Sequence, residues 1–411
     1  MKIVYVSQVF PPDPGPSLRA EEQARYLQRL GHDVTVVTTM SYYPSGRTAA
    51  AYRRKLHVVE HHDGVNVIRV WSLPAPNRGI ARRVLSQMSF AVASFLVAAR
   101  IEKPDLVIAS THILAIELAV IALARLKRCA SLIELRDLLP ESLALTGVRP
   151  ASVRARLLRR YFDFCLQRAD LVAVPSETMV PHLVRRGVDE DRIVLMPHGS
   201  DSERFARADP AGVIRRHGLE GRFVVVYAGS FSPYYDIPNI IRAATLVCEA
   251  RHDVAFILIG DGHGRYSREC LQKEASNGNV ILTGHVPPRS VVDYLSAADL
   301  CITSLTGAST PGFYRDYPTT KVCDYLMAGK PVLAVENAPV MGDYLGHIEA
   351  GEAVAGEDPR ALARAVLSLC SDPERLCPYS ENAYRHARAH MDRMVIVRAF
   401  DDALRARMGE K

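Results

Sequence analysis

Short apolar, β-branched segments alternate with amphipathic helical segments along most of this 411-residue sequence. In the first half the strand-like segments are residues 2–6, 34–39, 65–70, 106–110, 131–135, 171–175 and 192–196, and helical patterns such as 17–30 and 81–101 lie between several of them. Alternation of strand and helix predicts βαβ units, whose parallel strands are covered by helices on both faces. The first half therefore predicts an α/β fold with a doubly wound sheet.

The same pattern restarts after a polar, turn-rich stretch at 198–222. The second set of strand-like segments is 223–228, 254–259, 280–283, 300–303 and 331–335, with helical patterns near 237–250, 288–297, 320–328 and 358–370. This length suits two domains. We predict an N-terminal Rossmann-like domain at 1–200 and a C-terminal one at 201–391, with a helix at about 392–411 that packs back on the first. Ligands of such sheets bind at the carboxyl ends of the strands.

The composition favours a soluble globular protein and argues against several other classes of protein. Hydrophobic residues make up 48% and charged residues 23%, as in soluble globular proteins, and no apolar run is long enough to span a bilayer. The eight cysteines form no CxxC pair, which argues against a zinc site or a disulfide framework and fits a reducing cytoplasm. The net charge of +6 fits an anionic substrate or membrane surface, whereas no basic motif with interleaved aromatics predicts nucleic-acid binding.

The segment 315–331 carries the most specific cluster of polar residues. Thr319 or Thr320 can cap a helix whose first amides point at a phosphate. Lys321 lies in the first turn, where a cation opposes the helix dipole, so a role in neutralising a diphosphate explains it better than a structural one. Asp324, one turn on, can accept hydrogen bonds from a ribose diol, and Asp316 can meet the hydroxyls of a sugar. The alternative is a capped surface helix with solvated charges.

Three other stretches are weaker candidates. The loop 11–17, with Gly15, opens a helix and can present amides to an anion, although it matches neither GxGxxG nor a Walker A loop and can be a plain turn. Asp137 follows Arg136 at the end of an apolar strand, where either a ligand or an ion pair is expected. The cluster 57–63, HVVEHHD, resembles a metal site in composition, but it precedes Gly64 and a strand, so we expect a solvated hairpin turn.

The sequence as a whole resembles glycosyltransferase family four, and most closely its bacterial cell-surface polysaccharide enzymes of the fucosamine-transferase type. The segments that carry the resemblance are FPPDPGPS, ELRDLLPES, RIVLMPHGSDSERF, FILIGDGHG, VILTGHVPPRSVVDYLSAADL and PTTKVCDYLMAGKPVLA. They extend over nearly the full length, and the last is the most specific. The resemblance implies the GT-B fold, in which two facing Rossmann-like domains enclose the active site in an inter-domain cleft.

The resemblance also implies roles for individual residues. Asp324 corresponds to a Glu that binds the ribose, and Asp316 to the Glu that meets the donor sugar. Asp137 corresponds to a His near the reacting sugar. The remaining positions would surround the diphosphate and the base: Gly15, Gly229, Ser230, Gly284, His285, Val286, Thr319, Thr320 and Lys321. The loop 229–236 departs from the family, because it has no Arg or Lys where most members carry a basic pair; Arg315 or Lys321 would then compensate.

These implications predict a retaining hexosyltransferase that uses a UDP- or GDP-type nucleotide sugar by front-face substitution, with no metal and no other cofactor. The expected acceptor is a lipid-linked saccharide or a small molecule, in the cytoplasm or at the inner face of the membrane. Four arginines flank the apolar part of 81–101, which predicts either peripheral contact with an anionic membrane or a core helix with basic ends: Arg78, Arg82, Arg83 and Arg100. The alternatives are a tailoring enzyme for a soluble natural product, a sugar-nucleotide 2-epimerase and a non-catalytic partner subunit.

Overall fold

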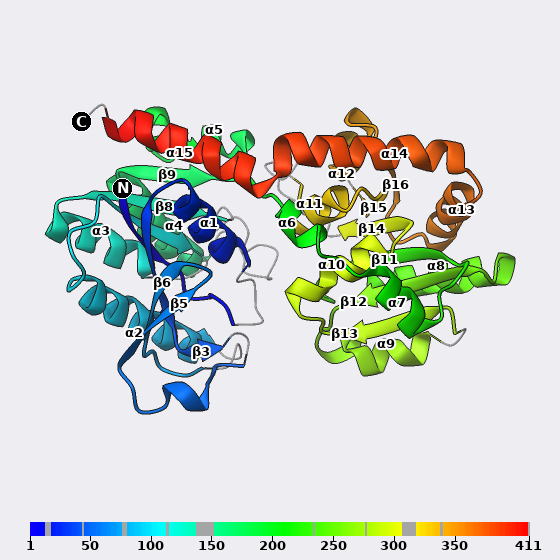
Figure 1. Cartoon of the computed structure of the whole chain (residues 1–411), viewed down its shortest axis with the longest axis horizontal. Coiled ribbons are helices and arrows are strands. Elements are labelled where there is room, and N and C mark those ends of the chain that lie inside the picture. Colours follow the sequence, from blue (N-terminus) through cyan, green and yellow to red (C-terminus); the bar gives the residue numbers. More distant parts are fainter. Residues whose placement is uncertain are drawn as a thin grey trace. The chain divides into compact units, whose positions relative to one another are not determined.

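The computed structural model describes residues 1–12, 18–42, 45–75, 80–111, 115–136, 152–232, 235–275, 278–305, 318–337 and 340–409. The chain forms two compact units, each built around its own sheet (Figure 1). Unit 1 comprises Met1–Pro197 and Ile396–Lys411, and unit 2 comprises His198–Val395. Among the described helices, none combines the length and the apolar character needed to cross a bilayer.

Unit 1 contains an eight-stranded sheet in the order β10-β9-β8-β7-β1-β2-β6-β5. All of its pairs are parallel except the one between β5 and β6. A separate two-stranded ribbon joins β3 to β4. The strands are β1 (Lys2–Val6), β2 (Asp33–Thr39), β3 (Ser41–Tyr42), β4 (Arg47–Thr48), β5 (His57–His62), β6 (Val65–Val70), β7 (Leu106–Thr111), β8 (Ala130–Leu135), β9 (Leu171–Val174) and β10 (Ile193–Leu195).

The edge hairpin of β5 and β6 corrects the expectation for 57–63. That stretch is not a turn, because its first six residues form a strand whose side chains alternate between exposed and half-buried. The turn is confined to Asp63 and Gly64, whose φ angles of 45° and 84° are the left-handed values that a tight two-residue hairpin requires. The sheet of unit 1 is therefore mixed and not wholly parallel.

The helices of unit 1 are α1 (Leu18–Arg29), α2 (Ile80–Ala98), α3 (Ile116–Lys127), α4 (Val153–Arg168), α5 (Val180–Val184) and most of α15 (Arg393–Gly409). From β6 through β9 the chain crosses the sheet in one direction, so right-handed crossovers put α2, α3 and α4 on one face and α1 on the other. In agreement, α3 contacts both α2 and α4. The apolar faces of α2 and α3 form one core with β1 and β7.

Unit 2 contains a six-stranded parallel sheet in the order β13-β12-β11-β14-β15-β16. Its strands are β11 (Phe223–Ala228), β12 (Val254–Ile259), β13 (Val280–Gly284), β14 (Leu300–Leu305), β15 (Val332–Glu336) and β16 (Gly351–Ala355). Its helices are α6 (Ser202–Phe205), α7 (Pro210–His217), α8 (Ile237–Ala250), α9 (Arg268–Glu274), α10 (Pro288–Ser296), α11 (Thr320–Met327), α12 (Met341–His347), α13 (Pro359–Cys370) and α14 (Pro373–His386). The short edge strand β16 has no counterpart among the segments that the sequence predicts.

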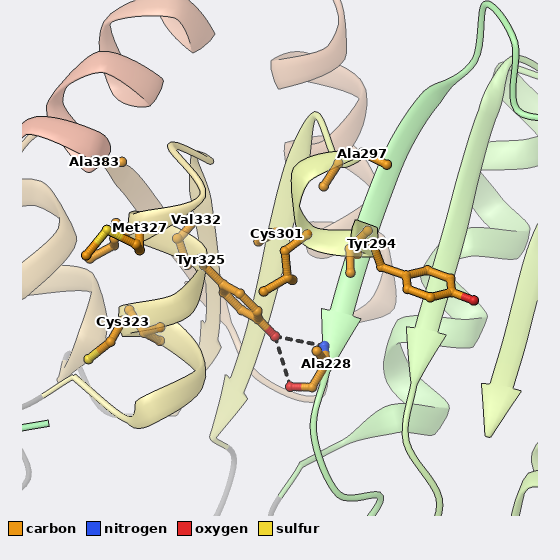
Figure 2. Close-up of a cluster of buried hydrophobic side chains, with 14 of the residues drawn as sticks. Ala228, Tyr294, Ala297, Cys301, Cys323, Tyr325, Met327, Val332 and Ala383 are labelled. Carbon is orange, nitrogen blue, oxygen red and sulfur yellow. Dashed lines mark hydrogen bonds between the residues drawn. The ribbon is translucent and has the colours of Figure 1, made fainter. Parts of the chain in front are cut away.

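A buried tyrosine fixes α11 against the centre of this sheet (Figure 2). The hydroxyl of Tyr325 accepts a hydrogen bond from the amide of Ala228 at 2.8 Å and donates one to the carbonyl of Ala228 at 3.1 Å. Because Ala228 is the last residue of β11, this contact holds α11 at the carboxyl end of the sheet.

The last helix belongs mainly to unit 1, since the chain returns to that unit at Ile396. Asp401 Oδ1 lies 2.8 Å from Nε2 of His32, and both residues are buried. Leu404 is fully buried as well. The final segment is therefore an integral part of the packing of unit 1 and not a loose tail.

Candidate functional site

Three loops at the carboxyl ends of β11, β12 and β13 are joined by backbone hydrogen bonds. The amide of Gly229 donates to the carbonyl of Ile259 at 2.9 Å, and the amide of Gly260 donates to the carbonyl of Gly284 at 3.0 Å. Gly260 has to be a glycine, because a Cβ atom there would lie 1.9 Å from the carbonyl oxygen of Gly229. The loops therefore form one rigid shelf beside the start of α11.

Lys321 projects onto this shelf from the first turn of α11. Its Nζ lies 3.2 Å from the hydroxyl of Tyr227 and 3.4 Å from the ring centroid of Tyr235, and a Cβ on Gly229 would be 3.1 Å from it. Among the described residues, no carboxylate forms an ion pair with this ammonium group. Aromatic rings and a phenol thus surround a cation that has no counter-ion in the part of the chain that the structure describes.

This environment changes the acid–base behaviour of the lysine. Burial of the ammonium group lowers the pKa of Lys321 to about 7. A lysine with that pKa is charged in only part of the molecules at neutral pH, and a bound anion would favour its charged form. The arrangement therefore suits a group that recovers its charge by binding a phosphate.

Two buried hydroxyl groups, one at the start of α11 and one in the loop after β11, lack partners in the described structure. Thr319 is the N-cap residue of α11, but its side chain makes no capping bond, which corrects the expected role of this residue as a side-chain cap. Its buried Oγ1 atom and the buried Oγ of Ser232, in the loop after β11, have no hydrogen-bond partner among the described atoms. Buried hydroxyls are normally satisfied, so both are candidates to contact a polar ligand. Thr320, by contrast, is exposed.

Asp324 lies one turn beyond Lys321 and has partners of its own. Its Oδ1 atom accepts a hydrogen bond from the hydroxyl of Ser200 at 2.5 Å and lies 3.6 Å from a guanidinium nitrogen of Arg204. These two residues come from the HGSDSERF segment, and neither was predicted to belong to the site. Within the described residues, Asp324 Oδ2 has no hydrogen bond or ion pair, so this oxygen could accept a hydrogen bond from a ligand.

The segment predicted to border the base lies at the end of β13. Gly284 is the last residue of that strand, His285 is exposed, and Val286 packs partly against the core. A guanidinium nitrogen of Arg268, at the start of α9, would lie 3.3 Å from a Cβ on Gly284. Arg268 was missed because it is distant in sequence from the loop 229–236, yet it supplies a positive charge to the same edge of the sheet.

Of the predicted site residues, Gly229, Ser230, Gly284, His285, Val286, Thr319, Thr320, Lys321 and Asp324 all belong to this edge of unit 2. Ser230 is exposed, and its carbonyl accepts a hydrogen bond from the hydroxyl of Tyr227. Gly15, Asp137 and Asp316 lie outside the described residues, so their predicted roles stay predictions. Tyr227 and Tyr235 were not predicted, since only the folded chain brings them to Lys321.

The carboxyl end of the sheet in unit 1 has a different character. Glu134, at the end of β8, accepts hydrogen bonds from Arg19 at 2.7 Å, Gln23 at 2.9 Å and Tyr5 at 2.7 Å, all buried. Although burial opposes ionisation, the guanidinium groups of Arg19 and Arg136 hold the pKa of Glu134 far below its usual range. This cluster fixes the start of α1 and the end of β8 from within the unit.

Comparison with known proteins identifies the family. Residues 15–199 match the profile of the glycosyl transferase 4-like domain, and residues 213–386 match that of glycosyl transferases group 1. The chain is 26% identical over 272 residues to the colanic acid biosynthesis glycosyl transferase WcaI of Escherichia coli K12, covering 63% of this chain and 65% of WcaI. It is 27% identical over 221 residues to the D-inositol 3-phosphate glycosyltransferase of Rhodococcus jostii, covering 52% of this chain and 46% of that protein. The matches thus span less than two thirds of the length of these relatives.

Solved structures show the same fold. The sucrose-phosphate synthase of Thermosynechococcus elongatus superposes with a TM-score of 0.73 at 18% identity, covering 100% of both chains. Anabaena HepE, solved in complex with UDP and glucose, gives 0.70 at 18% identity, covering 99% of this chain and 100% of HepE. The fold is GT-B, and the chain belongs to glycosyltransferase family four.

Proposed function

We propose that the protein transfers a hexose-like unit from a UDP- or GDP-type nucleotide sugar to an acceptor hydroxyl, with retention of anomeric configuration, during synthesis of a cell-surface glycan or glycolipid. The observation that carries the proposal is Lys321, a desolvated cation without a described counter-ion, at the start of a helix and on the shelf formed by three strand-end loops. The name of WcaI and the nucleotide in the HepE structure support the pathway and the donor class, respectively.

In the proposed reaction, the bond between the anomeric carbon and the diphosphate oxygen breaks while the acceptor oxygen bonds to the same face of that carbon. The proton of the acceptor hydroxyl passes to the leaving phosphate oxygen. Negative charge therefore grows on the diphosphate, where the ammonium group of Lys321 and the first amides of α11 would stabilise it. Oδ2 of Asp324 would accept a hydrogen bond from a hydroxyl of the ribose, and Arg268 would add positive charge beside the base.

The test is a binding screen of the full chain against nucleoside diphosphates and nucleotide sugars. A ligand that binds only the folded state raises the free energy of unfolding by about 2.7 kcal/mol at a hundredfold excess over its dissociation constant. One nucleotide should raise the melting temperature of the wild type, and Lys321→Met should abolish that rise. The matched control is Lys273→Met on α9, where the lysine is exposed and the rise should persist.

The outcomes separate the remaining alternatives. If no nucleotide at millimolar concentration changes the melting temperature, the donor site is refuted and a non-catalytic partner subunit becomes the better description. If a nucleotide sugar binds and is isomerised without any acceptor, the chain is a 2-epimerase. If transfer occurs to a soluble natural product but to no lipid-linked saccharide, the protein is a tailoring enzyme.

A further inference from the structure

An apolar groove of about 1060 Å³ lies between α2 and the β5–β6 hairpin in unit 1. Four of its lining residues form a stripe on α2 at helical spacing: Leu85, Met88, Val92 and Leu96. Leu56, just before β5, and Trp71, just after β6, line the opposite side. All six are exposed large hydrophobic side chains, and Leu56 is 79% exposed.

The helix layer that includes α2 forms a face of unit 1 with further exposed apolar side chains. The helices α2, α3 and α4 form one layer over the sheet, and α3 and α4 add the exposed side chains Leu126 and Leu157. Single exposed hydrophobic residues are common, but a contiguous apolar patch on a soluble protein marks an interaction site. This face therefore indicates a partner whose contact surface is itself apolar.

The charges around the groove indicate the kind of partner. From Gly64 to Ile101 the chain has five arginines and no Asp or Glu, and one of the five, Arg69, is buried and pairs with Glu60. Arg82 and Arg83 near the start of α2 and Arg100 after its end are exposed. Cations at the beginning of a helix oppose its dipole, so they do not stabilise the helix and are better explained by an anionic partner.

A second group of basic residues lies on the other side of the groove. Arg53, Arg54 and Lys55 are exposed and directly precede Leu56. A second copy of this chain would bring the same positive charges face to face in a two-fold interface, which is unfavourable. An apolar surface with a cationic rim instead complements a layer whose interior is apolar and whose surface is negative.

We infer that this face of unit 1 docks on an anionic phospholipid bilayer. The helix α2 lies in the plane of the interface, with its stripe of Leu85, Met88, Val92 and Leu96 toward the acyl chains and the groove occupied by part of one chain. The arginines remain at the level of the phosphate groups, as expected for long basic side chains at a membrane surface. This inference goes beyond the proposed function, since membrane docking does not require the nucleotide site.

The experiment is flotation of the full chain with vesicles of phosphatidylcholine alone and with vesicles that also contain phosphatidylglycerol. The protein should float with the anionic vesicles, bind them more weakly at high salt, and bind neutral vesicles weakly. Met88→Glu/Val92→Glu should abolish flotation. Arg82→Ala/Arg83→Ala should weaken binding about thirtyfold, since each basic residue near such a surface contributes about fivefold.

The matched control is Tyr384→Glu in α14 of unit 2, because Tyr384 and Met88 are 51% and 50% exposed. Circular dichroism and melting curves establish that each variant is folded. The inference is overturned if the wild type does not bind anionic vesicles, or if Met88→Glu/Val92→Glu binds as tightly as the wild type. It is equally overturned if sedimentation shows that the same double variant converts a dimer into a monomer, because the face would then join two copies. None of these measurements involves a nucleotide, so their failure is distinct from failure of the donor site.

Discussion

The two units use charge differently at the carboxyl ends of their sheets. In unit 1 the buried Glu134 accepts hydrogen bonds from Arg19, Gln23 and Tyr5, so the charged and polar groups satisfy one another. In unit 2 the ammonium group of Lys321 lies over the ring of Tyr235 and beside the hydroxyl of Tyr227, without a carboxylate among the described residues. The first arrangement stabilises the unit, whereas the second leaves a cation poorly solvated.

The difference separates a structural charge from a binding charge. Removing one partner from a satisfied buried cluster leaves the others unpaired, so it weakens the fold. Removing a desolvated cation that has no counter-ion should weaken the fold little, because relief of its unfavourable burial offsets the lost contacts with Tyr227 and Tyr235. Unit 1 variants are therefore expected to affect stability, and unit 2 variants to affect donor binding.

The largest expected effect is on stability in unit 1. Glu134→Ala leaves the guanidinium groups of Arg19 and Arg136 buried without their carboxylate and should lower the free energy of unfolding by about 3–5 kcal/mol. Denaturation in urea measures the loss. Glu134→Gln, which keeps the shape and part of the hydrogen bonding, should lose less. Equal stability of Glu134→Ala and the wild type would remove the contrast between the units.

The second largest expected effect is on turnover of the donor in unit 2, with little change in stability. Lys321→Met should reduce turnover of the donor by about 10²–10³-fold, as removal of a group that stabilises developing negative charge does. The free energy of unfolding should change little. Donor consumption and a melting curve on the same sample measure both quantities. A large loss of stability in Lys321→Met would show that the lysine is structural after all.

The pH dependence of donor binding sharpens the comparison. Because the pKa of Lys321 is lowered to about 7, the free protein loses this charge as the pH rises above 7, and the affinity for a nucleotide sugar should fall by up to about tenfold per pH unit. Above pH 7, binding should take up a proton. Calorimetry at pH 8 in two buffers of different ionisation enthalpy detects the uptake, which should be absent at pH 5, where Lys321 is already charged in the free protein.

The smallest effect concerns the aromatic wall. Tyr235→Ala exposes the ammonium group of Lys321 to water, so the midpoint of the pH dependence should move upward, toward the ordinary pKa of lysine. Loss of the ring contact itself should change donor affinity only a few-fold, or about 0.5–1 kcal/mol. Tyr235→Phe keeps the ring and should leave the midpoint in place. An unchanged midpoint in Tyr235→Ala would falsify the view that this ring contributes to the burial that lowers the pKa of Lys321.

Much of the fold followed from local pattern. β1, β11 and β12 end where the apolar runs end, because strands buried on both faces have an unbroken hydrophobic sequence. The strand β5 was missed because an edge strand alternates between exposed and half-buried residues, and its histidines and Glu60 make it look like a polar loop. β16 was missed for a similar reason: GEAVA is short and only half buried.

The sequence by itself determined the two doubly wound units, the family and the helix that carries Lys321 and Asp324, since these depend on periodicity and on residues that are neighbours in the chain. Only the tertiary structure decided the surroundings of these side chains. Tyr227 of β11 and Tyr235 of the segment after it contact Lys321, and Ser200 contacts Asp324 across 124 positions in the sequence. Their effect on charge depends on burial and distance, and neither quantity exists before the strands are packed together.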